Sequence, residues 1–171
     1  MTYRIVKYGD PVLEKPAAFI TAFGTPELEQ LVADMFETMY AHKGIGLAAP
    51  QIALSQRLAV IDLSAGEEEP QKIVLINPEI IRREGSQLGE EGCLSIPGFR
   101  EDVKRAKRVT LRARNTKGET FEVSGDDLLA RAMQHEIDHL NGVLFLSHLS
   151  MLKRDLIKRK IRKLQKAGEW S

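Results

Sequence analysis

The feature that most constrains this chain is a pair of histidines four residues apart, His135 and His139, with Glu136 directly after the first. Residues at this spacing lie one above the other on the same helix face, with Cβ atoms about 5–6 Å apart. Two imidazoles on that face can bind one metal ion, and Glu136 projects to the side, where it can reach a water beside the metal. The chain has only 4 histidines, so a chance pair around a glutamate explains the motif poorly. The motif predicts a helix that bears a metal centre.

The residues around the motif are typical of one helix. Ser124 and Asp127 predict a capping box near its start, and Gly142 predicts its end. Apolar residues recur at helical spacing at Leu128, Leu129, Ala132, Met133, Ile137 and Leu140.

A catalytic metal site usually has three protein ligands, so a third must come from elsewhere. One class of metallopeptidase extends the motif to a further histidine, but this chain has Phe145 there. The only downstream acids are Asp155, inside a basic helix, and Glu169, near the end of the chain, and His148 follows a new apolar segment. Cys93 is therefore the best candidate, because a bound cation deprotonates a coordinating thiol. A lone cysteine is otherwise most often a small buried apolar residue.

The segment Gly44–Gln51 reads Gly-Ile-Gly-Leu-Ala-Ala-Pro-Gln. Its G-x-G-x-x-A pattern is shared with dinucleotide-binding loops, but those need a strand before and a helix after the glycines. Here a helix precedes the segment, and Pro50 interrupts any helix after it. We interpret it as a tight strand whose backbone can pair with an extended ligand, with Gln51 as a hydrogen-bond donor at its end. Gly44 also predicts the end of the preceding helix.

The remaining elements predict an α+β fold, because helices stand at both ends of the chain and strands stand between them. Thr25 caps the first helix and Pro26 occupies its first position. Strands are expected at 57–63, 72–76, 107–114 and 119–123, and turns at 66–70 and 115–118. A third helix is expected at 149–166, with an apolar stripe formed by Leu149, Leu152, Leu156, Ile157, Ile161 and Leu164.

Composition restricts the class of protein. The 171 residues fit one domain, and a single cysteine excludes an intrachain disulfide. The first residues lack the features of a signal or transit peptide, and no apolar run is long enough to span a membrane, so a cytoplasmic protein without membrane contact is expected. The net charge of +1 hides an acidic body and a basic end, since residues 147–171 hold eight Lys or Arg and two acids. Such asymmetry favours a polyanionic partner.

Three segments together make the chain similar to the peptide deformylases. That family is marked by a G-apolar-G-apolar-A-A-x-Q segment, an E-G-C-apolar-S segment and an H-E-x-x-H helix, in this order. The sequence has Gly44–Gln51, Glu91–Ser95 and His135–His139 without departure from the pattern, and the similarity covers nearly the whole chain.

The resemblance implies short, mainly antiparallel sheets wrapped around a central H-E-x-x-H helix, with an N-terminal helix and a basic C-terminal helix. It divides the chain into a catalytic domain at 1–148 and a C-terminal helix at 149–171, packed on that domain or projecting from it. It also implies the activity, removal of the formyl group from the N-terminal methionine of new proteins with release of formate.

The resemblance also assigns roles to individual residues. Cys93, His135 and His139 are implied as metal ligands and Glu136 as the group that moves the proton. The side chain of Gln51 and the backbone N–H of Leu94 are implied to hold the oxyanion, which needs preorganised donors. Gly46 is implied near the reacting end of the substrate. The physical chemistry agrees, because a metal activates water for attack near neutral pH and a carboxylate can transfer its proton to the leaving nitrogen.

The residues of the substrate pocket and the identity of the metal are predicted less directly than the metal ligands. Leu128 and Arg131 lie on the helix turns that lead to His135, and Ile45 is expected on the opposite wall, with the charge of Arg131 at the rim. Gly92, where the backbone can approach a ligand closely, is also expected to bind the substrate. Sulfur and nitrogen ligands suit zinc, whereas the resemblance implies ferrous iron in the cell, with zinc, nickel or cobalt as replacements.

Two predictions concern contacts outside the site. Asp138 and Arg105 are expected to pair and brace the two segments that bear metal ligands, with two independent surface charges as the alternative. The basic C-terminal helix is expected to dock on the ribosome, with a merely solvated amphipathic helix as the alternative. A metallopeptidase and a structural metal site in a ribosome-binding module are the other functions considered for the chain.

Overall fold

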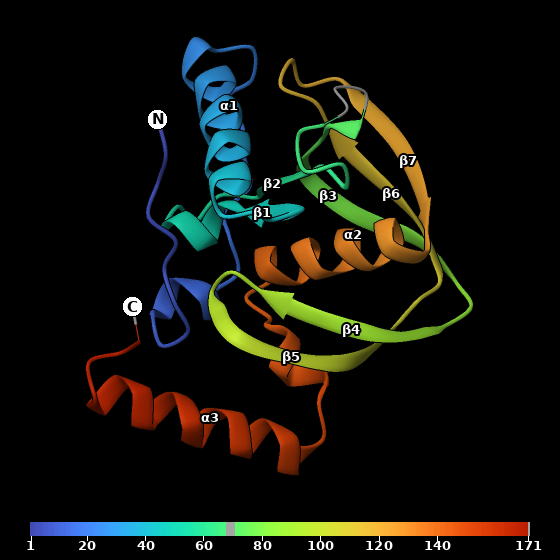
Figure 1. Cartoon of the computed structure of the whole chain (residues 1–171). Coiled ribbons are helices and arrows are strands. Elements are labelled where there is room, and N and C mark those ends of the chain that lie inside the picture. Colours follow the sequence, from blue (N-terminus) through green and yellow to red (C-terminus); the bar gives the residue numbers. More distant parts are fainter. Residues whose placement is uncertain (68–70, 171) are drawn as a thin grey trace.

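Two antiparallel sheets and three α-helices make up the computed structural model of the protein, which describes residues 1–67 and 71–170 (Figure 1). The helices are α1 (Pro26–Ala41), α2 (Asp127–Leu140) and α3 (Met151–Lys166). The larger sheet has the order β1-β2-β3-β6-β7, with β1 (Gly46–Ala48), β2 (Leu58–Ile61), β3 (Ile73–Glu84), β6 (Arg108–Arg114) and β7 (Thr120–Asp126). The smaller sheet is the hairpin of β4 (Gln87–Cys93) and β5 (Ile96–Arg105), and short 3-10 helices are η1 (Pro11–Glu14), η2 (Ala49–Ile52) and η4 (Phe145–His148).

Helix α2 lies between the two sheets, in the middle of the molecule (Figure 1). It contacts β1, β2, β6 and β7 of the larger sheet and β5 of the hairpin. The α+β fold with a central H-E-x-x-H helix is therefore confirmed. None of the helices among residues 1–67 and 71–170 is long and apolar enough to cross a membrane.

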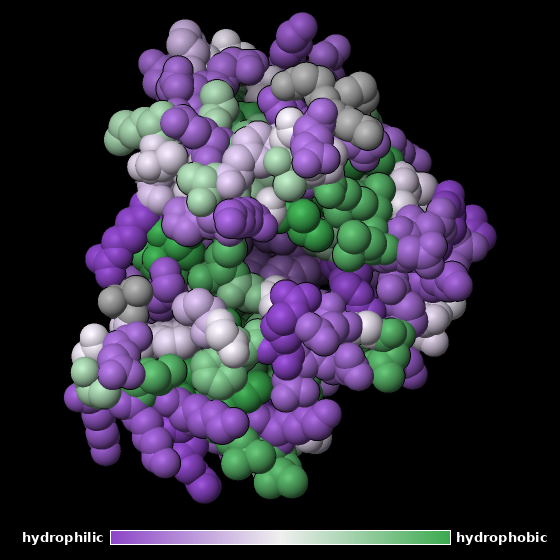
Figure 2. All heavy atoms as spheres, in the orientation of Figure 1, coloured by the Kyte–Doolittle hydropathy of each residue, from purple (hydrophilic) through white to green (hydrophobic). Residues whose placement is uncertain are grey.

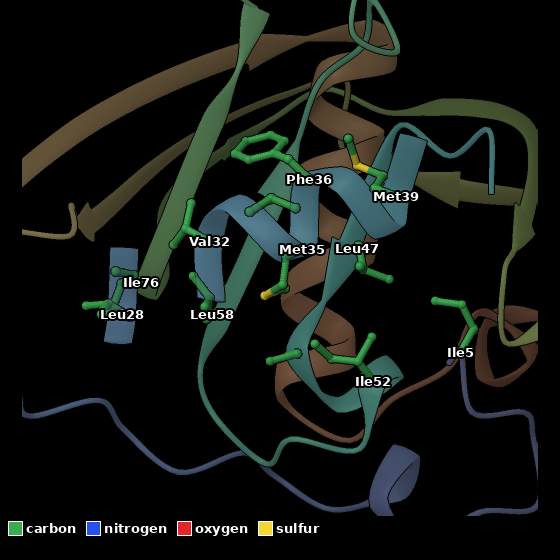
Figure 3. Close-up of a cluster of buried hydrophobic side chains, with 12 residues drawn as sticks. Ile5, Leu28, Val32, Met35, Phe36, Met39, Leu47, Ile52, Leu58 and Ile76 are labelled. Carbon is green, nitrogen blue, oxygen red and sulfur yellow. The ribbon is translucent and has the colours of Figure 1, made fainter. Parts of the chain in front are cut away.

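Clusters of buried apolar side chains hold these elements in place. The first packs α1 on β1, β2 and β3, with Met35, Met39 and Leu47 fully buried (Figure 3). The second packs α2 on β6 and β7 through residues such as Met133 and Leu111. Burial of each large apolar side chain contributes about 1.5–3 kcal/mol, so these clusters are the main force that fixes α2 between the sheets.

Helix α1 begins as expected but ends one turn before the predicted residue. The Thr25 hydroxyl accepts a hydrogen bond from Leu28 N–H at 3.1 Å, which caps the helix start. The helix ends at Ala41, and Lys43, not Gly44, adopts the left-handed conformation, with φ 57°. Gly44 instead closes the turn by donating its N–H to the carbonyl of Met39 at 2.9 Å.

The start of α2 differs from the predicted capping box. Strand β7 continues to Asp126, which pairs with Arg108 of β6, so Ser124 belongs to the sheet. Its hydroxyl contacts that of Thr110 at 2.8 Å, and no side chain caps the helix start. Because β7 pairs with β6 along its full length, the helix begins at Asp127, three residues after the predicted Ser124. Gly142 does end the helix, with φ 76°.

The strand predictions are correct in position but incomplete. The four expected strands correspond to β2, β3, β6 and β7, while the second half of β3 and the β4–β5 hairpin were not predicted. The turn at 115–118 is present, and Asn115 Oδ1 accepts hydrogen bonds from the N–H groups of Lys117 and Glu119. Residues 68–70 of the turn expected at 66–70 lie outside the described residues, as does residue 171.

Helix α3 packs on the rest of the chain along a narrower stripe than predicted. Ser150 caps it, and Ile157 and Ile161 are buried in a third apolar cluster with residues of η1, β5 and η4. Leu152 and Leu156, which were expected in the same stripe, are exposed at 73% and 44%. The stripe is narrower because α3 packs on β5 and η4 with one face only. The helix lies at the edge of the molecule, so its other faces are open to solvent (Figure 1).

Candidate active site

The three predicted metal ligands converge at one point beside α2. His135 and His139 come from consecutive turns of α2, and Cys93 is the last residue of β4. The two Nε2 atoms lie 3.1 Å apart, and Cys93 Sγ lies 3.4 Å from His139 Nε2. All three ligand atoms lie within 4.8 Å of one another. Two imidazole nitrogens and one sulfur at this separation fit a single divalent cation with an open coordination position.

A buried carboxylate, Glu91, fixes the orientation of the first histidine. Its Oε1 lies 2.8 Å from His135 Nδ1. Burial raises the pKa of Glu91, but hydrogen bonds from Arg105 and His135 outweigh it and hold this pKa well below its usual range. A carboxylate at this position requires the proton of His135 on Nδ1, which leaves the lone pair of Nε2 directed at the metal position.

The thiol of Cys93 is in an environment that favours its ligand form. Burial raises its pKa, but the neighbouring His139 and His135 lower it more strongly, to about 5. A thiolate is the form of cysteine that binds metals. The protein is therefore arranged to present sulfur as an anion beside the two imidazoles.

Glu136 lies next to the three predicted ligands but is not part of the converging group. It is 4% exposed, and its Oε1 has no hydrogen-bond partner among the described residues. Burial raises its pKa, although the nearby His135 and His139 lower it. A Cβ atom on Gly46 would collide with the Glu136 carboxylate, so this carboxylate lies directly against the β1 backbone. A buried carboxyl group with a free oxygen and a raised pKa is suited to accept and return a proton.

Gln51 and the turn after Cys93 form the wall of the site that faces the residues of α2. Gln51 Oε1 accepts a hydrogen bond from Ala48 N–H at 2.9 Å, which fixes the amide so that Nε2 faces Cys93. Nε2 lies 3.2 Å from Ser95 Oγ and 3.5 Å from Cys93 Sγ. Leu94 follows in the turn between β4 and β5. The predicted donor side chain is thus held beside the metal position by the backbone that precedes it.

A cavity of about 700 Å³ opens over these groups. Figure 2 shows it as a hollow in the face of the molecule above α2. Its lining includes every predicted site residue except His139: Ile45, Gly46, Gln51, Gly92, Cys93, Leu94, Leu128, Arg131, His135 and Glu136. Leu128 is 52% exposed and forms part of the entrance.

The predicted orientation of Arg131 is wrong. Its guanidinium is not at the rim but buried, where Nη1 donates to Glu91 Oε2 at 2.6 Å and to the carbonyl of Val103 at 2.9 Å. Gly89 makes this possible, because a Cβ there would meet Arg131 Nη2 at 3.0 Å. The positive charge is drawn inward because Glu91 is buried and negatively charged.

The predicted pair of Arg105 and Asp138 is present. Arg105 Nη1 donates to Asp138 Oδ2 at 2.6 Å, and its Nε and Nη2 donate to the two oxygens of Glu91 at 2.8 and 2.9 Å. His148 Nε2 lies 2.8 Å from the same Asp138 oxygen. Arg105 therefore connects Asp138, beside one metal ligand, to the carboxylate that orients another.

Two functional residues were not recognised in the sequence. Glu91 and Ser95 received no role, although they orient His135 and contact Gln51, respectively. A signal for Glu91 was available: residues two apart on a strand share a face, so Glu91 and Cys93 point to the same side once β4 is recognised as a strand.

Comparisons with known proteins agree with this geometry. Residues 2–155 match the family model described as polypeptide deformylase. A peptide deformylase of Acidobacterium capsulatum is 64% identical over 97% of each chain, and one of Alkalilimnicola ehrlichii is 50% identical over 96% of this chain and 91% of that protein.

Solved structures give the same result. The crystal structure of a peptide deformylase from Legionella pneumophila is 44% identical, covers 100% of this chain and 99% of its own, and superimposes with a TM-score of 0.91. That of the peptide deformylase from Thermus thermophilus is 42% identical over 95% of each chain, with a TM-score of 0.88.

Proposed function

The chain belongs to the polypeptide deformylase family, and from this premise we propose how its individual residues perform the reaction. As a member of the family, the protein is a metal-dependent hydrolase that removes the N-formyl group from nascent peptides. The observation that supports the assignment of the site is the convergence of Cys93, His135 and His139 within 4.8 Å, beside the unpartnered oxygen of Glu136.

Cys93, His135 and His139 would hold the cation, and Glu136 moves the proton. A bound divalent cation supplies Lewis acidity, which activates water and polarises the formyl oxygen. Glu136 takes a proton from the attacking water and returns it to the nitrogen that leaves the formyl carbon, so the carboxylate ends the cycle as it began. Its burial raises its pKa, and its Oε1 has no hydrogen-bond partner among the described residues, so this oxygen is free to accept a proton.

Gln51 and Leu94 stabilise the oxyanion. The Gln51 amide is held by Ala48 N–H and faces Cys93, so no reorganisation is needed when negative charge develops on the formyl oxygen. The backbone N–H of Leu94 is the second donor, in the turn directly after the metal ligand. Removing one such donor typically costs about 3–4 kcal/mol of transition-state stabilisation.

The side chain of the substrate's formyl-methionine lies in the part of the cavity that is lined by Leu128, Ile45, Gly92 and the buried stem of Arg131. The formyl group is the smallest acyl group. Because Gly46 has no side chain, the Glu136 carboxylate can lie directly against the β1 backbone at the point where we place this group. Ferrous iron is the metal that we assign in the cell, and zinc, nickel or cobalt would fit the same sulfur and nitrogen ligands.

The ribosome is the proposed docking partner, in the cytoplasm where nascent chains emerge. Seven of the eight basic residues of α3 have no carboxylate partner in the described part of the chain, and only Lys153 lies near an acid, 3.6 Å from Glu101. A helix with this charge gains from counterion release on RNA. This placement would bring the cavity close to its substrate.

Formate release from formyl-Met-Ala-Ser tests the proposed function. Protein stripped of metal should be inactive, and activity should return on reloading with ferrous iron under anaerobic conditions. Release of free amino acids in place of formate would indicate a peptidase, and no release by the reloaded protein would refute a catalytic centre at these residues.

A further inference from the structure

The entrance of the cavity is asymmetric in charge. Among its lining residues, Arg100 on the β4–β5 side pairs with Glu90, and Arg131 pairs with Glu91. Two further lining residues, Lys7 and Lys43, are cations that form no ion pair with a described acid. We call these two unpaired positive residues the cationic rim.

Lys7 is fixed beside the catalytic groups by the segment that bears it. Val6 N–H donates to the carbonyl of Gln51, and Tyr8 N–H donates to the carbonyl of Ser95, both at 2.8 Å. The Lys7 ammonium donates to the carbonyl of Ile5 at 3.0 Å. No described acid lies within ion-pair distance of this ammonium, and burial lowers the pKa of Lys7.

Lys43 marks the other end of the rim. It is exposed, adopts a left-handed conformation with φ 57°, and directly precedes the segment that leads into β1. The neighbouring His42 lines the same cavity and uses its Nδ1 to contact the carbonyl of Thr38 at 2.9 Å. The sequence has no acid between Lys43 and Gly46.

The peptide that follows the formyl-methionine passes this rim. Strand β1 is an edge strand, with β2 as its one neighbour in the described sheet. Asp62 N–H bonds to the carbonyl of Ile45, and Gly46 pairs with Ile61, so antiparallel alternation turns the N–H and C=O of Gly46 toward the open edge. A peptide whose formyl end lies at Gly46 can extend along this edge past Gly44 to Lys43. Because an extended chain advances about 3.3 Å per residue, its second and third residues reach Lys43.

From this arrangement, which rests on the proposed function, we propose that the enzyme selects nascent chains with acidic residues directly after the formyl-methionine. The positive rim attracts glutamate or aspartate at the second and third positions and repels lysine or arginine there. Exposed charges are screened by salt, so the selection is modest and depends on ionic strength. It acts on substrate binding, since neither lysine touches the reacting atoms.

Three peptides with amidated ends test the selection: formyl-Met-Glu-Glu-Ser, formyl-Met-Gln-Gln-Ser and formyl-Met-Lys-Lys-Ser. The glutamine peptide is the uncharged isostere of the first. At about 20 mM salt, kcat/KM should be about tenfold higher for the glutamate than for the lysine peptide, mainly through KM, with glutamine between them. The ratio should shrink toward one at about 500 mM salt, where the Debye length is only a few ångströms.

A variant without the two rim charges tests whether Lys7 and Lys43 cause the preference between the peptides. Lys7→Gln combined with Lys43→Gln should reduce the ratio between the glutamate and lysine peptides to about twofold or less. Lys117→Gln combined with Lys160→Gln removes the same charge at exposed positions remote from the cavity and should keep the tenfold ratio. Unfolding curves of both variants check that the fold is retained.

The outcomes separate this inference from the proposed function. Equal kcat/KM for the three peptides, a preference for lysine, or a tenfold ratio that survives in the rim variant would overturn the inference while deformylation stands. Failure of the metal-loaded enzyme to release formate from any of the peptides would overturn both.

Discussion

At the scale of single residues, the proton transfer that we propose depends on how closely Gly46 and Glu136 approach each other. A methyl group at position 46 would occupy space that the carboxylate of Glu136 now holds. Gly46→Ala should therefore displace the carboxylate and lower kcat by about 10- to 100-fold, since proton transfer by a positioned group contributes roughly 10²–10⁴-fold. Metal content by elemental analysis should stay the same. Gly44→Ala is the matched variant. Its only tight contact would be with the movable end of the Leu94 side chain, at 3.0 Å, and Met39 would lie at ordinary contact distance, so the loss should be smaller.

Glu136 itself gives a sharper prediction at the same scale. Glu136→Gln keeps the size and shape of the side chain but cannot accept a proton, so kcat should fall at least about 100-fold. Because Glu136 is not among the three converging ligands, metal affinity should change little. Measurement of formate release and of bound metal on the same preparation checks both statements. A variant with more than about one hundredth of the wild-type rate would remove Glu136 from the proton-transfer role.

At the scale of elements, Arg105 of β5 connects the hairpin to α2. It bonds to Glu91 of β4 and Asp138 of α2, next to ligands on each element. Arg105→Lys and Asp138→Asn should each weaken metal binding, and the double variant should lose less than the sum, with a coupling of about 1–3 kcal/mol. Chelator competition measures the affinities.

The exposed pair of Arg112 and Glu122, on β6 and β7, is the matched control for that cycle. Its substitutions should leave metal affinity unchanged. Additive losses at Arg105 and Asp138 would show that the two charges act independently of the metal ligands.

The elements also show which parts of the site the sequence could predict. The ligands on α2 were predictable because four-residue spacing on a helix is a local property. The β4–β5 hairpin was not, because Gln87–Cys93 is rich in glycine and charge and lacks the apolar alternation of a half-buried strand. Without the hairpin, the role of Glu91 and the inward turn of Arg131 could not be seen, since both depend on contacts between β4 and α2. Long-range contacts of this kind leave no periodic signal.

At the scale of the whole molecule, Asp62 connects acid stability to the fold. It is fully buried at the end of β2, where its carboxylate accepts hydrogen bonds from Tyr40 OH and from the hydroxyl and N–H of Ser64. Burial raises its pKa, but these hydrogen bonds together outweigh burial, so the pKa in the folded protein lies below the usual value of an aspartate. A group whose pKa is depressed by folding stabilises the protein above its unfolded pKa, and that contribution is lost as pH falls through the folded value.

Asp62→Asn should therefore lower Tm by roughly 5 °C at pH 7. The difference in Tm between wild type and variant should be constant from pH 7 to about pH 5 and should shrink below about pH 4, as the wild-type carboxylate becomes protonated. Thermal unfolding followed by circular dichroism over this range measures it. A difference that grows on acidification would contradict the assigned direction of the shift.

The basic face of α3 gives the last prediction, which needs a variant that leaves the fold intact. Deleting the helix would remove Ile157 and Ile161 from the apolar cluster beneath η4, so a truncation would confuse docking with stability. Lys160→Glu combined with Lys163→Glu changes only exposed charges and leaves both isoleucines in place. Ribosome co-sedimentation at low salt should fall by at least about tenfold, because each lost phosphate contact also forfeits counterion release.

The matched control for α3 is Lys107→Glu with Lys117→Glu, which makes the same change of charge on exposed residues in the two segments that flank β6. It should co-sediment like wild type, and all three proteins should release formate from a short formyl-peptide at similar rates. Wild-type binding should decrease steeply with salt, whereas binding of the α3 variant should be weak at every salt concentration. If the two variants bind ribosomes equally well, the charge on α3 serves solvation of the helix, and the polyanionic partner must be sought on another face.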